Sequence, residues 1–117
     1  MSKRQGYLFV AILFFCLLAA VIKANAGQVS LAWDELRTPP DRYEIFAAPV
    51  AAGRNPLTVK FDYTQPSWSG TATTCTINDL IDGQLYVFVC RAFVGTTASG
   101  DSNRVVYEIP QIKLRVE

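Results

Sequence analysis

The sequence of 117 residues contains no histidine. This absence excludes the Ser-His-Asp and Cys-His nucleophile arrangements, histidine-containing zinc sites and c-type haem attachment. The ten acidic residues form no recognisable catalytic pair, and there is no glycine-rich phosphate loop. We therefore expect no enzyme, no metal site and no cofactor.

Basic residues are also scarce after the first part of the chain. Three of the eleven, Lys3, Arg4 and Lys23, lie in the first 26 residues, which hold none of the ten acidic ones. A chain starting at Gly27 would thus carry a formal charge of −2 instead of +1. Nucleic-acid binding requires clustered Lys and Arg, so we expect no nucleic-acid partner.

The one long hydrophobic run covers residues 7–22. Lys3 and Arg4 precede it, and the small residues Ala24 and Ala26 follow it in an A-x-A pattern. This layout is typical of a secretory signal peptide over residues 1–26, with cleavage after Ala26. The prediction is an exported protein, secreted or periplasmic.

The alternative to cleavage is a membrane anchor formed by residues 7–22. That run is short, because a spanning helix needs about 20 apolar residues. Acylation of Cys16 is disfavoured, since Leu13, Phe14 and Phe15 before it are not small. A membrane contact is therefore expected only if the signal segment stays uncleaved.

The rest of the chain consists of short alternating runs separated by turn residues, the pattern of an all-β sandwich. Strands are expected over residues 29–33, 43–47, 57–63, 73–78, 85–94 and 104–109. Both faces of residues 85–94 are largely apolar, which predicts a central strand whose outer face is partly covered. Residues 64–72 are expected to form a loop.

Four segments in order resemble fibronectin type III domains, in particular those of bacterial secreted proteins. They are VSLAWD at 29–34, DRYEIFA at 41–47, TTCTINDLIDGQLYVFVCRAF at 73–93 and SNRVVYEIP at 102–110. The resemblance implies an immunoglobulin-like β-sandwich over residues 27–110. It also implies a corner at Leu80 and Tyr86, with the tyrosine hydroxyl bonded to nearby backbone. The structural core is expected to contain Trp33, Tyr43, Leu80, Tyr86 and Phe88.

The first strand of that family has no counterpart after the cleavage site. One side of the strand at 29–33 should then be an open edge, which proteins normally cover. Residues 111–117, where Ile112, Leu114 and Val116 alternate with charged residues, are either a frayed tail or an extra strand over that edge.

Cys75 and Cys90 are the only cysteines that remain after cleavage. Both lie on predicted inward faces, and an oxidising compartment permits a disulfide between them. Facing sheets are about 10 Å apart, whereas a disulfide needs Cα atoms within about 7 Å. A disulfide and two buried thiols both stay open.

Trp68 is the candidate contact residue, because nothing in the periodicity buries it. It is either an anchor for a partner or a lid over the sandwich edge. Asp101 and Glu108 are interpreted as solvated charges. The predicted function is a binding or scaffolding module whose partner is a protein; a carbohydrate-binding module using Trp68 is the alternative, and a hydrolase fragment comes third.

Overall fold

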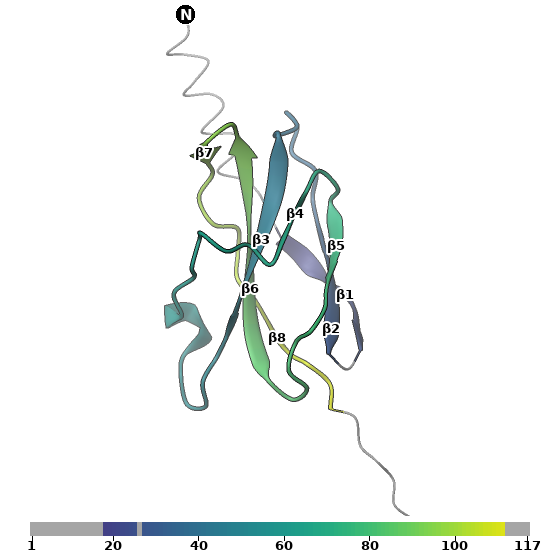
Figure 1. Cartoon of the computed structure of the whole chain (residues 1–117), viewed down its shortest axis with the longest axis vertical. Coiled ribbons are helices and arrows are strands. Elements are labelled where there is room, and N and C mark those ends of the chain that lie inside the picture. Colours follow the sequence, from purple (N-terminus) through teal and green to yellow (C-terminus); the bar gives the residue numbers. More distant parts are fainter. Residues whose placement is uncertain (1–17, 26, 112–117) are drawn as a thin grey trace, which may run out of the picture.

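The computed structural model describes residues 18–25 and 27–111 and shows two β-sheets packed face to face (Figure 1). Most of the predicted signal peptide, including Cys16, and the predicted tail from residue 112 lie outside the described residues. Among those described, no helix is long and apolar enough to cross a membrane.

The smaller sheet has the strand order β1-β2-β5. Its strands are β1 (Leu18–Asn25), β2 (Gln28–Trp33) and β5 (Thr74–Ile77). Both pairings are antiparallel, and β2 places its buried residues at every second position, as alternation predicts.

The larger sheet has the order β4-β3-β6-β7, and β8 also pairs with β6. Its strands are β4 (Trp68–Gly70), β3 (Arg42–Pro49), β6 (Leu85–Val94), β7 (Thr97–Ala98) and β8 (Val105–Glu108). The central strand β6 has the predicted bounds. The strands expected at 29–33, 43–47, 73–78 and 104–109 are present with ends shifted by up to two residues.

The core lies between the two sheets. Trp33, Tyr43, Tyr86 and Phe88 are buried in it, and Leu80 packs against it half-buried. The Tyr86 hydroxyl accepts a hydrogen bond from the Ile81 backbone N–H at 3.0 Å, which ties the turn between the sheets to β6. The corner implied by the resemblance is thus present in the structure.

The strand expected at 57–63 is wrong. A 3-10 helix, η1 (Pro56–Thr58), occupies its start, and the chain then runs without strand pairing until β4. The Asn55 side chain accepts from the Leu57 N–H and caps the helix, while Pro56 supplies no ladder donor. Val59, Phe61 and Tyr63 of this segment pack on the outer face of the larger sheet instead, while Leu57 stays exposed.

A first strand is present in the uncleaved chain, upstream of the predicted cleavage site. β1 pairs with β2 and covers the edge that the sequence predicted to be open after cleavage. Its residues lie inside the predicted signal peptide, and an apolar run suits both a signal and a strand next to a core. Cleavage after Ala26, which stays a prediction, would remove β1.

No bond joins Cys75 to Cys90. Cys75 lies on β5 of the smaller sheet and Cys90 on β6 of the larger one, both buried. The spacing of facing sheets, about 10 Å, explains why the disulfide does not form. Burial raises the pKa of the Cys75 thiol to about 12.

Candidate binding surface on the outer face of the larger sheet

The outer face of β3 and β6 is covered by the segment between β3 and β4. Phe46, Val87 and Val89 are buried although they point away from the main core. Val59 and Phe61 pack over Val87, and the Tyr63 ring meets Phe46 edge-on at 5.1 Å between centroids. This second apolar layer explains why both faces of β6 are hydrophobic, as the sequence predicted.

Arg91 fastens the end of the covering segment to the sheet. Its guanidinium carbon lies 3.5 Å from the centre of the Tyr63 ring, and its Nε donates to Asp101 Oδ1 at 2.7 Å. The Tyr63 hydroxyl donates to Asp101 Oδ2, also at 2.7 Å. The Asp101 carboxylate thus accepts hydrogen bonds from Arg91 and from Tyr63, and Arg91 stacks on the Tyr63 ring. Both hydrogen bonds are charge-assisted.

The surroundings of Tyr63 change the pKa of its hydroxyl. Burial raises the pKa of the Tyr63 hydroxyl above its ordinary value. The hydrogen bond that this hydroxyl donates to Asp101, and the negative charge of that carboxylate, raise the pKa further. Arg91 and Arg104 act in the opposite direction and do not offset the rise. Tyr63 therefore stays a neutral hydrogen-bond donor at physiological pH.

Two buried serines position Asp101. The Ser99 hydroxyl accepts from the Ala92 N–H at 3.0 Å, and the Ser102 hydroxyl accepts from the Cys90 N–H at 2.8 Å. The N–H groups of both serines donate in turn to carbonyls of β6. These four bonds hold the loop after β7 against β6, so Asp101 projects from a fixed backbone.

Arg104 fastens the other end of the covering segment. It donates from one terminal nitrogen to the carbonyls of Pro56 and Val59, at 2.9 and 2.7 Å. Its guanidinium lies 5.0 Å from the centre of the Phe61 ring. We call Phe61, Tyr63, Arg91, Asp101 and Arg104 the arginine–aromatic surface.

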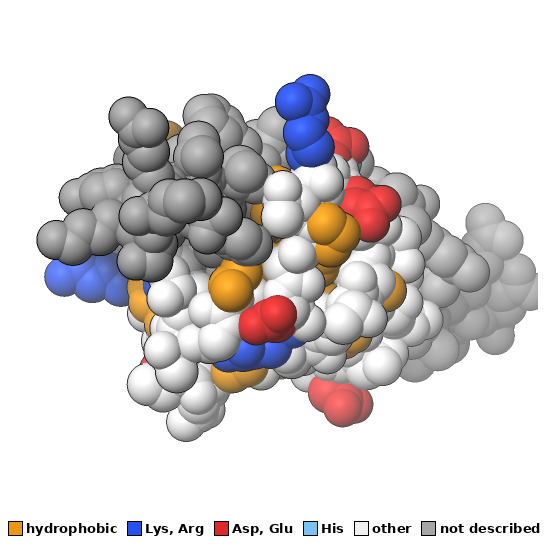
Figure 2. Space-filling view, turned by 90° about the horizontal axis from the view of Figure 1, so that it is seen from above, with side chains coloured by type: hydrophobic (Ala, Val, Ile, Leu, Met, Phe, Trp, Pro, Cys, Tyr) orange, Lys and Arg blue, Asp and Glu red, His pale blue; other side chains and the backbone are white. Residues whose placement is uncertain are grey.

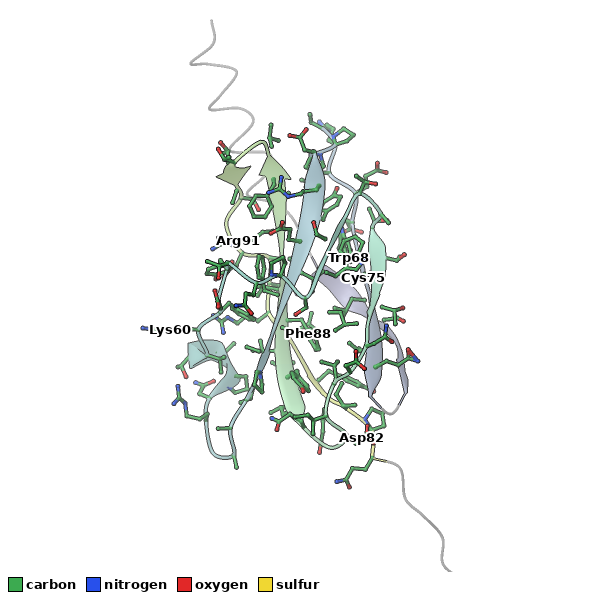
Figure 3. All side chains as sticks on the ribbon, viewed as in Figure 1. Lys60, Trp68, Cys75, Asp82, Phe88 and Arg91 are labelled. Carbon is green, nitrogen blue, oxygen red and sulfur yellow. The ribbon has the colours of Figure 1, made fainter. Side chains whose placement is uncertain are left out.

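The arginine–aromatic surface is held by hydrogen bonds and ring contacts and is still accessible to solvent. Tyr63 is 37% exposed, and the side chains of Arg91 and Asp101 keep 23% and 27% of their area in solvent. Val106, on the outer face of neighbouring β8, is 40% exposed. Figure 3 shows Arg91 on the side of β6 that faces away from Trp68 and Cys75.

Sequence reasoning missed this surface. It placed Phe61 and Tyr63 on a strand and treated Asp101 as a solvated charge. The sequence did contain one indication of this surface, namely Arg91, a cation on the outer face of an otherwise apolar strand. When that face is covered, the guanidinium needs a hydrogen-bond partner. Glu108, by contrast, is exposed on β8.

Trp68, proposed from the sequence as a contact residue, lies on β4. β4 is the edge strand of the larger sheet, on the side of the sandwich where β5 is the edge strand of the smaller one. Its ring meets the Trp33 ring edge-on at 5.4 Å between centroids and packs half-buried against the core. A Cβ on Gly70 would stand 2.7 Å from the Trp68 ring, so the ring lies directly over this glycine. Trp68 therefore closes the gap between the sheets.

A hollow of about 280 Å³ lies where the turns after β3 and before β6 meet. Arg54 is the one charged residue in its lining, which offers no acid–base pair. Within residues 18–25 and 27–111, no three Cys, Asp or Glu residues gather as a metal site would require.

Charges are dispersed on the end of the molecule seen from above. Figure 2 shows acidic and basic side chains scattered between uncharged ones on the part that is not grey. The arginine–aromatic surface holds two arginines and one carboxylate, Asp101, so its formal charge is +1.

No protein-family model matches the chain, and the comparison with curated proteins gave no match either. Solved structures are similar. A fibronectin type III domain of the human KIAA0970 protein is 16% identical, with a TM-score of 0.79 over 99% of this chain and 88% of that one. The domain of human fibronectin type III domain containing protein 3 is 20% identical, with a TM-score of 0.65 over 84% of this chain and 86% of that one.

A β-1,2-glucanase from Parabacteroides distasonis also matches, at 15% identity and a TM-score of 0.65, over 85% of this chain and 13% of that one. At these identities the likeness establishes the fold alone. The chain has the fibronectin type III fold, an all-β sandwich, as its sequence predicted.

Proposed function

We propose that this fibronectin type III fold serves as an exported, non-catalytic module that binds another protein through its arginine–aromatic surface. The fold is commonly that of a binding or scaffolding module, and most of the similar structures are domains without catalytic activity of their own. Fold alone does not fix function, so the proposal rests on the surface.

The observation that carries the proposal is the fixed position of Tyr63. Arg91 stacks on its ring and Asp101 holds its hydroxyl, yet Tyr63 keeps 37% of its surface in solvent. Tyr and Arg are enriched at the energetic centres of protein interfaces. A side chain that is ordered before binding loses less entropy when a partner arrives.

The carbohydrate alternative receives less support from the geometry. Sugar recognition would need an accessible face of Trp68, whereas the ring packs on Trp33 and over Gly70. The glucanase match covers a small part of that enzyme and says nothing about sugar binding by this chain.

Export is the second part of the proposal, and its support is the signal-like pattern of residues 1–26. The protein would then meet its partner in the periplasm, at the cell envelope or outside the cell. The net charge of −2 expected after cleavage is consistent with a partner other than nucleic acid.

The test is capture of the partner from cell-envelope extract with the exported protein as bait. Tyr63→Ala should abolish the capture, while Ile81→Ala, which removes a residue that is 64% exposed elsewhere, should leave it unchanged. Circular dichroism verifies that both variants are folded. Equal capture by both, or binding to a glycan array that Trp68→Ala abolishes, would contradict the proposal.

A further inference from the structure

The edge of β2 depends on residues that the predicted processing removes. β1 consists of Leu18–Asn25, and cleavage after Ala26 would separate it from the domain. Any inference about this edge rests on the export half of the proposed function. The chain starting at Gly27 would keep β2 and lose its only neighbour on that side.

The consequence for β2 is specific. Val29 and Leu31 are fully buried and Trp33 is 4% exposed, and the register places Ala24, Val21 and Leu18 of β1 opposite them. The Trp33 N–H donates to Thr73 on the β5 side. Because successive N–H groups of a strand point to opposite sides, those of Ser30 and Ala32 point toward β1. Cleavage would leave these two donors and an apolar flank open.

The described chain ends beside the start of the same strand. The Gln111 side chain lies over Gly83, where a Cβ would stand 2.6 Å from Gln111 Nε2. The Leu80 N–H, in the same turn, donates to the Gly27 carbonyl at 2.9 Å. Gly27 and Gln111 therefore flank one short turn. Figure 1 shows the turn between β1 and β2 and the end of the described chain after β8 at the same, lower end of the molecule.

The residues that follow have the composition that the edge requires. Ile112, Leu114 and Val116 alternate with Lys113 and Arg115. Three apolar residues at every second position match the three buried positions of β2, Val29, Leu31 and Trp33. The charged residues would face solvent together with Ser30 and Ala32.

We propose that, after cleavage, residues 112–116 replace β1 on the edge of β2 in the same chain. Because the tail starts at the end where β2 starts, the new strand runs parallel to β2, opposite in direction to β1. Pro110 and Gln111 supply the bend that this reversal needs. A tail already held beside β2 has a high effective concentration there, which favours its own domain over a neighbouring copy.

The test uses the full chain expressed in cells, from which the exported form is recovered and its mass determined. Hydrogen exchange is then measured at Ser30 and Ala32. We expect Leu114→Asp to speed exchange at both amides at least about tenfold, since the inward apolar residue is lost, and Arg115→Asp to change it by less than about twofold. Protection at Val89 and Cys90 in β6 serves as the reference for intact folding.

Three results would overturn the inference. Equal exchange in both variants would mean that the tail does not cover β2. A dimer that depends on Leu114, detected by light scattering, would mean that the tail pairs with another copy. A mass that still includes residues 18–25 would mean that β1 stays in place, and it would also contradict the predicted cleavage on export. Binding of a partner through Tyr63 is tested independently of this result, by the capture experiment with Tyr63→Ala.

Discussion

Arg91 Nε lies 2.7 Å from Asp101 Oδ1, and the same carboxylate accepts the Tyr63 hydroxyl. A residue of the central strand, one of the covering segment and one of the loop after β7 thus meet at one point. This contact joins the outer layer to the sheet and at the same time sets the position of the most exposed member of the arginine–aromatic surface.

We expect Arg91 and Asp101 to couple energetically. Both side chains retain about a quarter of their exposure, so the coupling should be about 1 kcal/mol, near the upper end for pairs in contact with solvent. A double-mutant cycle with Arg91→Met and Asp101→Asn, measured by urea unfolding, gives this value. Additive effects of the two substitutions would show that the pair does not hold the covering segment.

The raised pKa of Tyr63 makes the domain sensitive to alkali. The folded state holds the Tyr63 proton more tightly than the unfolded chain, so this stability is complete below the unfolded pKa of about 10 and is lost as pH rises through the folded pKa. Tyr63→Phe should flatten that part of the stability curve. An unchanged slope above pH 10 would count against the Asp101 contact.

The corner between the sheets should also be measurable. Tyr86→Phe removes the acceptor of the Ile81 N–H and is expected to destabilise the domain by about 1 to 2 kcal/mol. Tyr107→Phe is the matched control, because no hydrogen bond of its hydroxyl is found in the described part of the chain. Similar losses in both variants would contradict a specific role for the corner.

The cysteines provide a chemical test. Two thiols of the exported protein should react under denaturing, non-reducing conditions, and Cys75 should react very slowly in the native protein at pH 8, because burial raises its pKa to about 12. A single intramolecular disulfide, detected as a loss of two mass units and no titratable thiol, would contradict the arrangement of the two sheets.

The sequence predicted the sandwich because alternation in β2, β3 and β6 is strong and each turn carries its own signal. It failed at residues 57–63, where apolar alternation arises from packing on a second layer and not from a strand. Propensity cannot separate these two cases, because both place every second side chain against an apolar surface. The two cases, a strand and a packed covering segment, are distinguished only by the position of residues 57–63 over Phe46 and Val87 in the structure.

The candidate site was harder to predict. Trp68 attracted attention because it lies among turn residues, yet Gly70 and Trp33 give its ring a place at the edge of the core. Asp101 was passed over because the serines that position it act through backbone bonds to β6, which no local pattern reveals. The contact between Trp33 and Trp68 joins residues far apart in sequence, and the serine bonds depend on how the loop after β7 folds back onto β6.

The most direct test of the central claim is crosslinking in living cells with a photoreactive amino acid at position 106, beside the arginine–aromatic surface. We expect a crosslink to one envelope or extracellular protein that disappears with Tyr63→Ala and is not formed from position 81. A crosslink from both positions, or one from position 106 that Tyr63→Ala leaves intact, would contradict it.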